Sequence, residues 1–142
     1  MTEPFPLPRK GFGYGGQSMV EFALAASAFF LLIFAVIQMG LVIYTYNTLA
    51  SATRDATRYA IMHGPNRSNT ASQSQVTTVL LNDAADLNSS NLTVNLTWPA
   101  DANMPSQSDA KVNASYSYTV QIPFTSPITL TLTASDQMLV EQ

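Results

Sequence analysis

The chain has 142 residues, enough for one domain, and only 11% of them are charged. An ordinary soluble domain carries about 25% charged residues. The low fraction here indicates that part of this chain lies in an environment other than water. The formal net charge is −3 and the basic residues form no stripe, so we expect no binding to nucleic acid. With no cysteine and one histidine, disulfides are excluded, and we expect no cofactor, no metal and no enzymatic activity.

The N-terminal segment carries positive charge and then several glycines. Arg9 and Lys10 precede the sequence GFGYGG at residues 11–16. The glycines predict a flexible, extended backbone of the kind that a protease accepts in its cleft. This pattern is not a nucleotide-binding loop, because no strand precedes it and the helix after it is apolar.

An apolar run extends from Phe22 to Tyr46 and contains no Lys, Arg, Asp or Glu. A helix needs about 20 apolar residues to cross a bilayer, so the run predicts a transmembrane segment at about residues 22–46. A buried core helix is a poor alternative, because the roughly 80 residues that follow could not cover it on all sides. A cleaved secretory signal is a second poor alternative, because the apolar region of such a signal has only about 7–15 residues.

Flanking charges indicate the orientation of this segment. Arg9 and Lys10 lie just before it and favour a cytoplasmic N-terminus, with the rest of the chain outside. Arg54 and Arg58 lie on the other side and weaken that bias.

The same helix is predicted to continue beyond the membrane and to occupy residues 17–64, since no glycine or proline occurs in residues 47–62. Apolar side chains recur there at three- and four-residue steps and predict one buried face. They are Leu49, Ala52, Ala56, Tyr59 and Ala60, with Met62 or His63 one turn further. Gly64 and Pro65 end the helix, which would be about 70 Å long.

Glu21 stands at the edge of the apolar run, one residue before Phe22. A carboxylate at this place costs free energy unless it reaches water or a cation. On physical grounds alone, an interfacial side chain that reaches water and a functional acid are equally good interpretations.

The sequence around Glu21 resembles the processing signal of type IV prepilins. In that signal a glycine precedes the cleaved bond and a glutamate is the fifth mature residue, and here it reads GQSMVEF at residues 16–22. Residues 15–64 are similar to the TadE-like pseudopilins of tight-adherence (Tad/Flp) pilus systems, including the segment ATRDATRYA at residues 52–60. One departure is Gln38, which stands where these proteins usually have an acidic residue before a mid-helix glycine.

The resemblance implies a minor pilin or pseudopilin that takes part in assembling a tight-adherence type IV pilus. It implies that a prepilin peptidase cuts between Gly16 and Gln17, so that residues 1–16 are a leader peptide. It also implies that Glu21, beside Phe22, pairs with the N-terminal ammonium of a neighbouring subunit.

The partners expected from this resemblance are the membrane, the prepilin peptidase and other pilin or pseudopilin subunits. The expected location is the bacterial cytoplasmic (inner) membrane, crossed once with the N-terminus in the cytoplasm and the head outside, or a pilus. A second class of function stays open, namely an unprocessed membrane-anchored binding domain displayed outside the cytoplasmic membrane. That alternative predicts an intact N-terminus and no dependence on Glu21.

Residues 65–142 are predicted to form a small soluble α+β head. A second helix is predicted at Val76–Leu87, with Ser72 or Ser74 as its N-cap and apolar residues on one face. A polar loop is expected at Pro99–Asp109.

Three segments of this head alternate between apolar and polar residues and are predicted to be strands, at Leu92–Trp98, Lys111–Ile122 and Ile128–Ala134. The last two are expected to pair as an antiparallel hairpin, and Asp136–Glu141 as a further short edge strand. The two helices are available to cover the sheet. The predicted fold class is therefore α+β, a long N-terminal transmembrane helix that extends into a small antiparallel-sheet head, as in pilin-like proteins.

Overall fold

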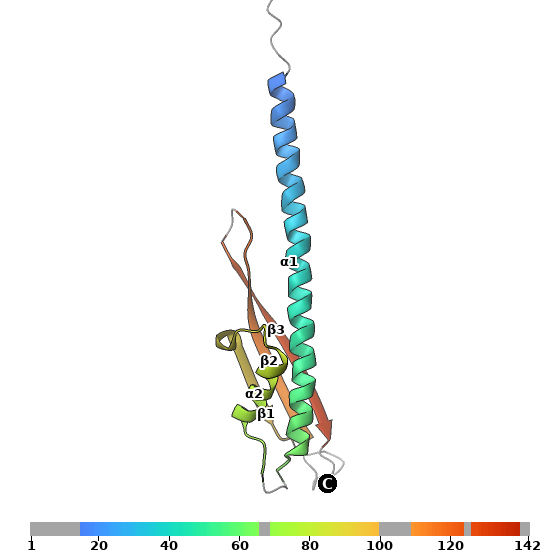
Figure 1. The fold of residues 1–142 in the computed structure, drawn as a ribbon, viewed down its shortest axis with the longest axis vertical. Coiled ribbons are helices and arrows are strands. Elements are labelled where there is room, and N and C mark those ends of the chain that lie inside the picture. The colour runs from blue at the N-terminus through green and yellow to red at the C-terminus, as the bar shows by residue number, and fades with distance from the viewer. Residues whose placement is uncertain (1–14, 66–68, 100–108, 124–125, 140–142) are drawn as a thin grey trace, which may run out of the picture.

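The computed structural model describes residues 15–65, 69–99, 109–123 and 126–139. One long helix stands beside a small sheet (Figure 1). The elements in chain order are α1 (Gly15–Met62), α2 (Gln73–Asp83), a 3-10 turn (Ser89–Asn91), β1 (Leu92–Thr97), β2 (Asp109–Val120) and β3 (Ile128–Leu139). A long apolar helix followed by a three-stranded antiparallel sheet confirms the predicted α+β architecture.

The sheet has the strand order β1-β2-β3, and both pairs of neighbours are antiparallel. β2 and β3 form the predicted hairpin, which pairs Val120 with Ile128 at one end and Asp109 with Leu139 at the other. The prediction of a separate edge strand at Asp136–Glu141 is wrong, because β3 runs on to Leu139. No glycine or proline follows Ala134, so the strand continues along its partner.

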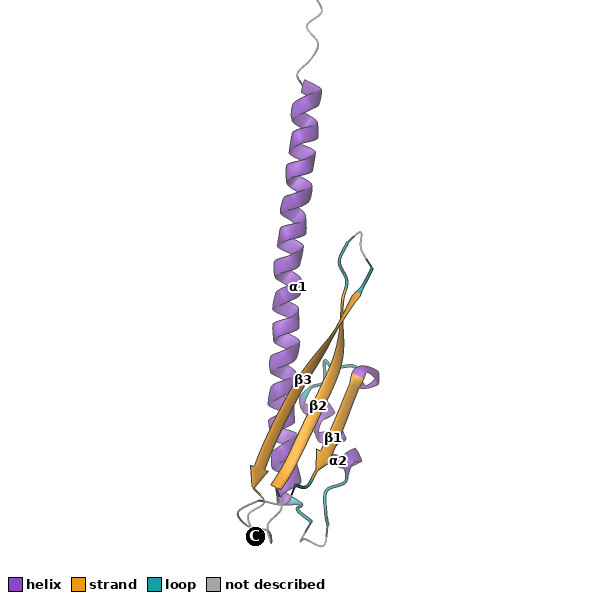
Figure 2. Ribbon diagram, turned by 180° about the vertical axis from the view of Figure 1, so that it is seen from behind, coloured by secondary structure: helices purple, strands orange, loops and turns teal. Residues whose placement is uncertain are grey.

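Both helices lie on one face of the sheet (Figure 2). The face of α1 that packs against the head consists of small side chains and one leucine, all buried: Thr45, Leu49, Ala52, Thr53, Ala56, Thr57 and Ala60. The prediction for Leu49 and the three alanines is confirmed. Met62 is 64% exposed and does not belong to this face, because it lies at the end of the helix. Small side chains let the α1 backbone approach the strands closely.

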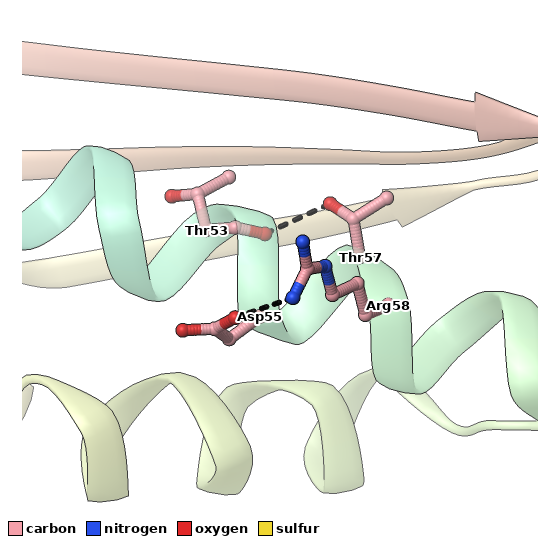
Figure 3. A network of polar contacts seen from close by, with 4 residues as sticks. All are labelled: Thr53, Asp55, Thr57 and Arg58. Carbon is pink, nitrogen blue, oxygen red and sulfur yellow. Dashed lines mark hydrogen bonds and ion pairs between the residues drawn. The ribbon is translucent and has the colours of Figure 1, made fainter.

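The buried threonines of α1 were not predicted, and their hydrogen bonds explain how they are tolerated. The Thr57 hydroxyl donates to the carbonyl oxygen of Thr53 at 2.8 Å (Figure 3). The Thr53 hydroxyl donates to the carbonyl oxygen of Leu49 at 2.7 Å. Each polar atom thus has a partner inside the helix. Asp55 and Arg58 are exposed on the same helix, with a nitrogen–oxygen distance of 3.9 Å.

Helix α2 begins three residues earlier than predicted, because Ser72 caps it. The backbone N–H of Gln75 donates to the Ser72 hydroxyl, and the Gln75 side chain accepts from the Ser72 N–H, which forms a capping box. The helix ends at Asp83, but Leu87 is still buried in the turn that follows. The boundaries of β1 and β2 differ from the predicted ones by one or two residues.

The first half of α1 has no cover in the structure. Its most apolar stretch is entirely unburied, and α1 is long and apolar enough to cross a membrane. This finding removes the alternative of a buried core helix and supports single-pass membrane anchoring. The head meets the helix at the end of the apolar run, where the Tyr44 hydroxyl donates to Asp86 at 3.0 Å and Thr45 is buried.

Substituting Leu49→Ala tests the packing of α1 on the head. Leu49 is fully buried, so the substitution should lower the free energy of unfolding by about 2–5 kcal/mol through lost burial and a cavity. The measurement is urea unfolding of the detergent-solubilised chain, followed by near-ultraviolet circular dichroism. The control is Ser51→Ala at an exposed position of the same helix; equal midpoints for the two variants would contradict this packing.

Candidate processing and assembly site

The predicted processing site lies in the first turn of α1. The helix begins at Gly15, so the expectation of an extended backbone through Gly16 is wrong. The first N–H groups of a helix need no partner within it, and a helix already formed downstream extends by a turn at little cost. Residues 1–14 of the predicted leader, including Arg9 and Lys10, lie outside the described residues.

Gly16 is exposed, and a Cβ added there would meet no atom within 4 Å. Nothing in the described fold therefore requires a glycine at this position. The bond between Gly16 and Gln17 is accessible from outside, and a protease that binds extended backbone has only the first helical turn to unwind. Glycine makes that unwinding easy, because it has the weakest helix preference after proline.

Gln17 and Glu21 lie one helical turn apart on the same side of α1. The Gln17 amide donates to a Glu21 carboxylate oxygen at 3.4 Å, and both side chains are exposed. In the described part of the chain, no cation lies within ion-pair distance of Glu21. A cut before Gln17 would create an ammonium group about 6 Å along the axis from Glu21, four residues at about 1.5 Å each.

Glu21 is surrounded along the helix by exposed apolar side chains. Met19 and Phe22 are each 75% exposed and Val20 is 60% exposed. In the described uncut chain, this single carboxylate stands within an uncovered apolar surface without a cation beside it. This arrangement is suited to a contact with another molecule that supplies both apolar surface and positive charge.

The segment at residues 52–60 has one buried side and one exposed side. Its alanines are buried against the head, whereas Arg54 and Arg58 are exposed. The departure from the family pattern, Gln38, is half-buried and faces the end of the β2–β3 hairpin. Two features have no local signal in the sequence and were not predicted. They are the position of the hairpin end beside α1 and the hydrogen bond between Tyr44 and Asp86.

His63 does not form part of a chemical site. Its Nδ1 atom lies 3.0 Å from the Tyr59 carbonyl oxygen, and its ring lies against the Tyr59 ring with centroids 4.4 Å apart. Across residues 15–65, 69–99, 109–123 and 126–139, no group of three or more His, Cys, Asp or Glu residues could hold a metal ion.

Comparison with protein families gives one match. The model of the family described as TadE-like protein matches residues 16–58, from the residue before the predicted cut to the arginine near the end of α1. The resemblance drawn from the sequence is confirmed. Comparison with curated proteins and with solved structures finds no match.

Substituting Gly16→Ala should leave the fold intact. The added methyl group meets open space, and alanine is the better helix former by about 1 kcal/mol. Urea unfolding of the detergent-solubilised chain should show a midpoint no lower than that of the wild type, and far-ultraviolet circular dichroism should show no loss of helix. A large loss of helix would mean that Gly16 has a structural function that the described residues do not reveal.

Proposed function

We propose that this chain, whose residues 16–58 match the model of TadE-like proteins, is a minor pilin or pseudopilin of a tight-adherence pilus. Its function is structural, in assembly with other subunits. The observation that carries this proposal is the uncovered apolar first half of α1 with one acid near its end.

A prepilin peptidase cuts after Gly16 in this proposal. Three observations support it: the glycine is exposed, no side chain packs on it, and the family match begins at this residue. The cut removes residues 1–16 and leaves Gln17 with a free amine. The N-terminus faces the cytoplasm and the head lies outside the inner membrane, as the charges of Arg9 and Lys10 favour.

Glu21 sets the register between subunits. A carboxylate deep in a bilayer costs about 3 kcal/mol on insertion scales, and an unpaired charge within packed apolar helices is similarly costly. Pairing Glu21 with the ammonium of Gln17 in a neighbouring subunit removes that cost. Direct pairing offsets the two helices by about 6 Å along their axes, so other registers leave two charges unpaired. Phe22, which is 75% exposed beside it, adds apolar area to the same contact.

The second candidate is an unprocessed binding domain displayed on the same anchor. The exposed face of the sheet favours it in one respect, since many of its outward side chains are polar and uncharged, such as Thr93, Asn95, Thr131 and Thr133. It does not account for an accessible Gly16 or for an acid within the apolar surface. We therefore prefer the pilin-like function.

The variant Gly16→Ala should block maturation in cells that carry the peptidase. In this proposal the peptidase cleft leaves no room for a side chain at the residue before the cut, so an added methyl group prevents productive binding. The measurement is the mass of the membrane-extracted protein, which should retain residues 1–16. A mass that corresponds to a chain beginning at Gln17 would contradict the proposed site, and the unchanged fold expected of this variant excludes misfolding as the cause.

The variant Glu21→Gln should yield a processed subunit that assembles poorly. Glutamine keeps the size of the side chain and can still bond to Gln17, but it removes the charge. We expect the recovery of co-purified neighbouring subunits to fall tenfold or more, which corresponds to about 1.4 kcal/mol or more. The matched control is Gln17→Ala, which removes the hydrogen bond within the helix and, where its mass shows that the cut has occurred, keeps both charges. Assembly of Glu21→Gln at the wild-type level would disprove the charge pairing.

A further inference from the structure

Strand β3 is the outer strand of the sheet, and the direction of its backbone groups follows from the pairing of β1 with β2. The Val94 carbonyl oxygen of β1 accepts from the Gln73 amide at 2.9 Å, so it points away from β2. The Asp109 N–H donates to the Pro99 carbonyl oxygen at 2.9 Å, which extends the ladder between the two strands. Bonded and non-bonded pairs alternate along an antiparallel ladder, so both observations direct the N–H and C=O of Ala114 toward β3.

The same alternation leaves one edge of β3 without a partner. Ala114 pairs with Ala134, so Ala134 and every second residue from it bond to β2. The residues between them direct N–H and C=O away from the sheet: Thr129, Thr131, Thr133, Ser135 and Gln137. Within the described residues, no hydrogen bond reaches these outward backbone groups. They form a row of donors and acceptors that matches another strand.

Residues 128–135 of β3 lack the features that commonly protect a sheet edge. Such features include a short strand, a bulge, a proline and a charged side chain. β3 (Ile128–Leu139) has 12 residues in unbroken register with β2, and its first charged residue is Asp136. The opposite edge of the sheet is protected, because β1 has only 6 residues and Gln73 occupies one of its outward carbonyl groups. β2 has a much shorter free edge, at residues 117–120.

We propose that the outward edge of β3 binds an extended strand of a different protein of the pilus system, which joins the sheet beside β3. The inference rests on the proposed function, because that function supplies neighbouring subunits. Addition of a strand to a free sheet edge is a recurrent mode of recognition, in which the main chain gives affinity and the side chains give specificity.

Membrane anchoring argues against a second copy of this chain as the source of an antiparallel strand. Leu130 lines an open groove of about 310 Å³ between the hairpin end and α1, next to Phe34. Further along, Ala134 belongs to the core that Ala56 also enters, so β3 runs in the same direction as α1 (Figure 1). Two antiparallel β3 strands would point two α1 helices in opposite directions. Chains inserted with the same topology in one membrane do not meet in this way.

Parallel contacts between two copies are disfavoured as well. In a parallel ladder, a residue bonds to the two neighbours of the residue opposite, and β3 presents only every second residue. Two parallel β3 strands would be offset by one residue, which a two-fold axis does not allow. The β1 edge of a second copy is already occupied in part by Gln73. The source that these constraints leave is a strand of another sequence.

The side chains along the edge indicate the composition of the added strand. No charged residue occurs between Lys111 and Asp136, so a charge in the added strand would find no opposite charge on residues 128–135. On the side of the sheet toward α1, Ile128 and Leu130 are 48% and 40% exposed and favour apolar neighbours. On the other side, the threonines favour threonine or serine. The partner strand is therefore uncharged and alternates between apolar and hydroxyl-bearing residues.

Amide hydrogen exchange of the full chain tests the proposal. The chain is compared in detergent, alone in vesicles of phosphatidylcholine and phosphatidylglycerol, and in membranes of cells that carry the pilus system, at one pH and temperature. After quenching, the chain is isolated and fragmented to single-residue resolution. The N–H groups of Leu130 and Leu132 bond to β2 and serve as the internal control.

We expect the N–H groups of Thr131 and Thr133 to exchange more slowly by about tenfold or more in the cell membranes than in the other samples, while Leu130 and Leu132 keep their rates. Equal rates in all samples would overturn the edge contact. Slow exchange that already appears in vesicles of the chain alone would show a second copy at the edge and would overturn the choice of partner. Equal slowing at all these residues would show a general stabilisation of the head and would also overturn the proposal.

The variant Thr131→Pro removes one outward donor and no bond to β2. In the cell membranes it should restore fast exchange at Thr133, and unchanged exchange at Leu130 and Leu132 shows that the sheet is intact. The matched control Thr131→Ala keeps the N–H group and should keep the slow exchange. Slow exchange at Thr133 in both variants would contradict the edge contact. Fast exchange at Thr133 in a wild-type chain that begins at Gln17 by mass would overturn this contact and leave the proposed function standing.

Discussion

The rest of the structure depends on one uninterrupted helix, α1, whose length sets how far apart its apolar first half and the head lie. α1 has 48 residues, about 70 Å at about 1.5 Å per residue, and all its interior backbone hydrogen bonds are internal, so it can pass from lipid to water without a break. From Phe22 to Ile43 its side chains are apolar apart from Ser27 and Gln38, and after Tyr46 apolar side chains form one face. The positions of the head, of the hairpin end and of Gly16 along the molecule all follow from this one element.

The apolar run of α1 and the head meet at Tyr44 and Thr45, two residues with hydroxyl groups. Thr45 is buried by the head and Tyr44 donates to Asp86, so the last turn of the apolar run is already part of the head's contact surface. The face that begins there continues through Leu49 to Ala60. In the other direction, half-buried Val42, Gln38 and Phe34 extend the same stripe toward the hairpin end. One stripe of α1 thus connects the core of the head with the groove beside the hairpin end.

The sequence predicted the features that depend on local periodicity. The apolar run, the alanines of the buried face and the alternation of β2 and β3 identified the helix, its packing side and the hairpin. The same alternation could not tell that Ala134 is buried while Ile128 and Leu130 are exposed, because a strand pattern is identical whether or not another element covers it. Likewise, Thr53 and Thr57 read as polar in sequence, yet hydrogen bonds within the helix allow their burial.

The identity of the site depended on a resemblance rather than on geometry, because Gly16 and Glu21 contact little in the described structure. The most direct test of the account is the N-terminus of the protein extracted from membranes of cells that carry the prepilin peptidase. Mass spectrometry of its N-terminal peptide should find Gln17 as the first residue. If the main species extracted from these membranes is instead a peptide in which Gly16 and Gln17 are still joined, the account is contradicted.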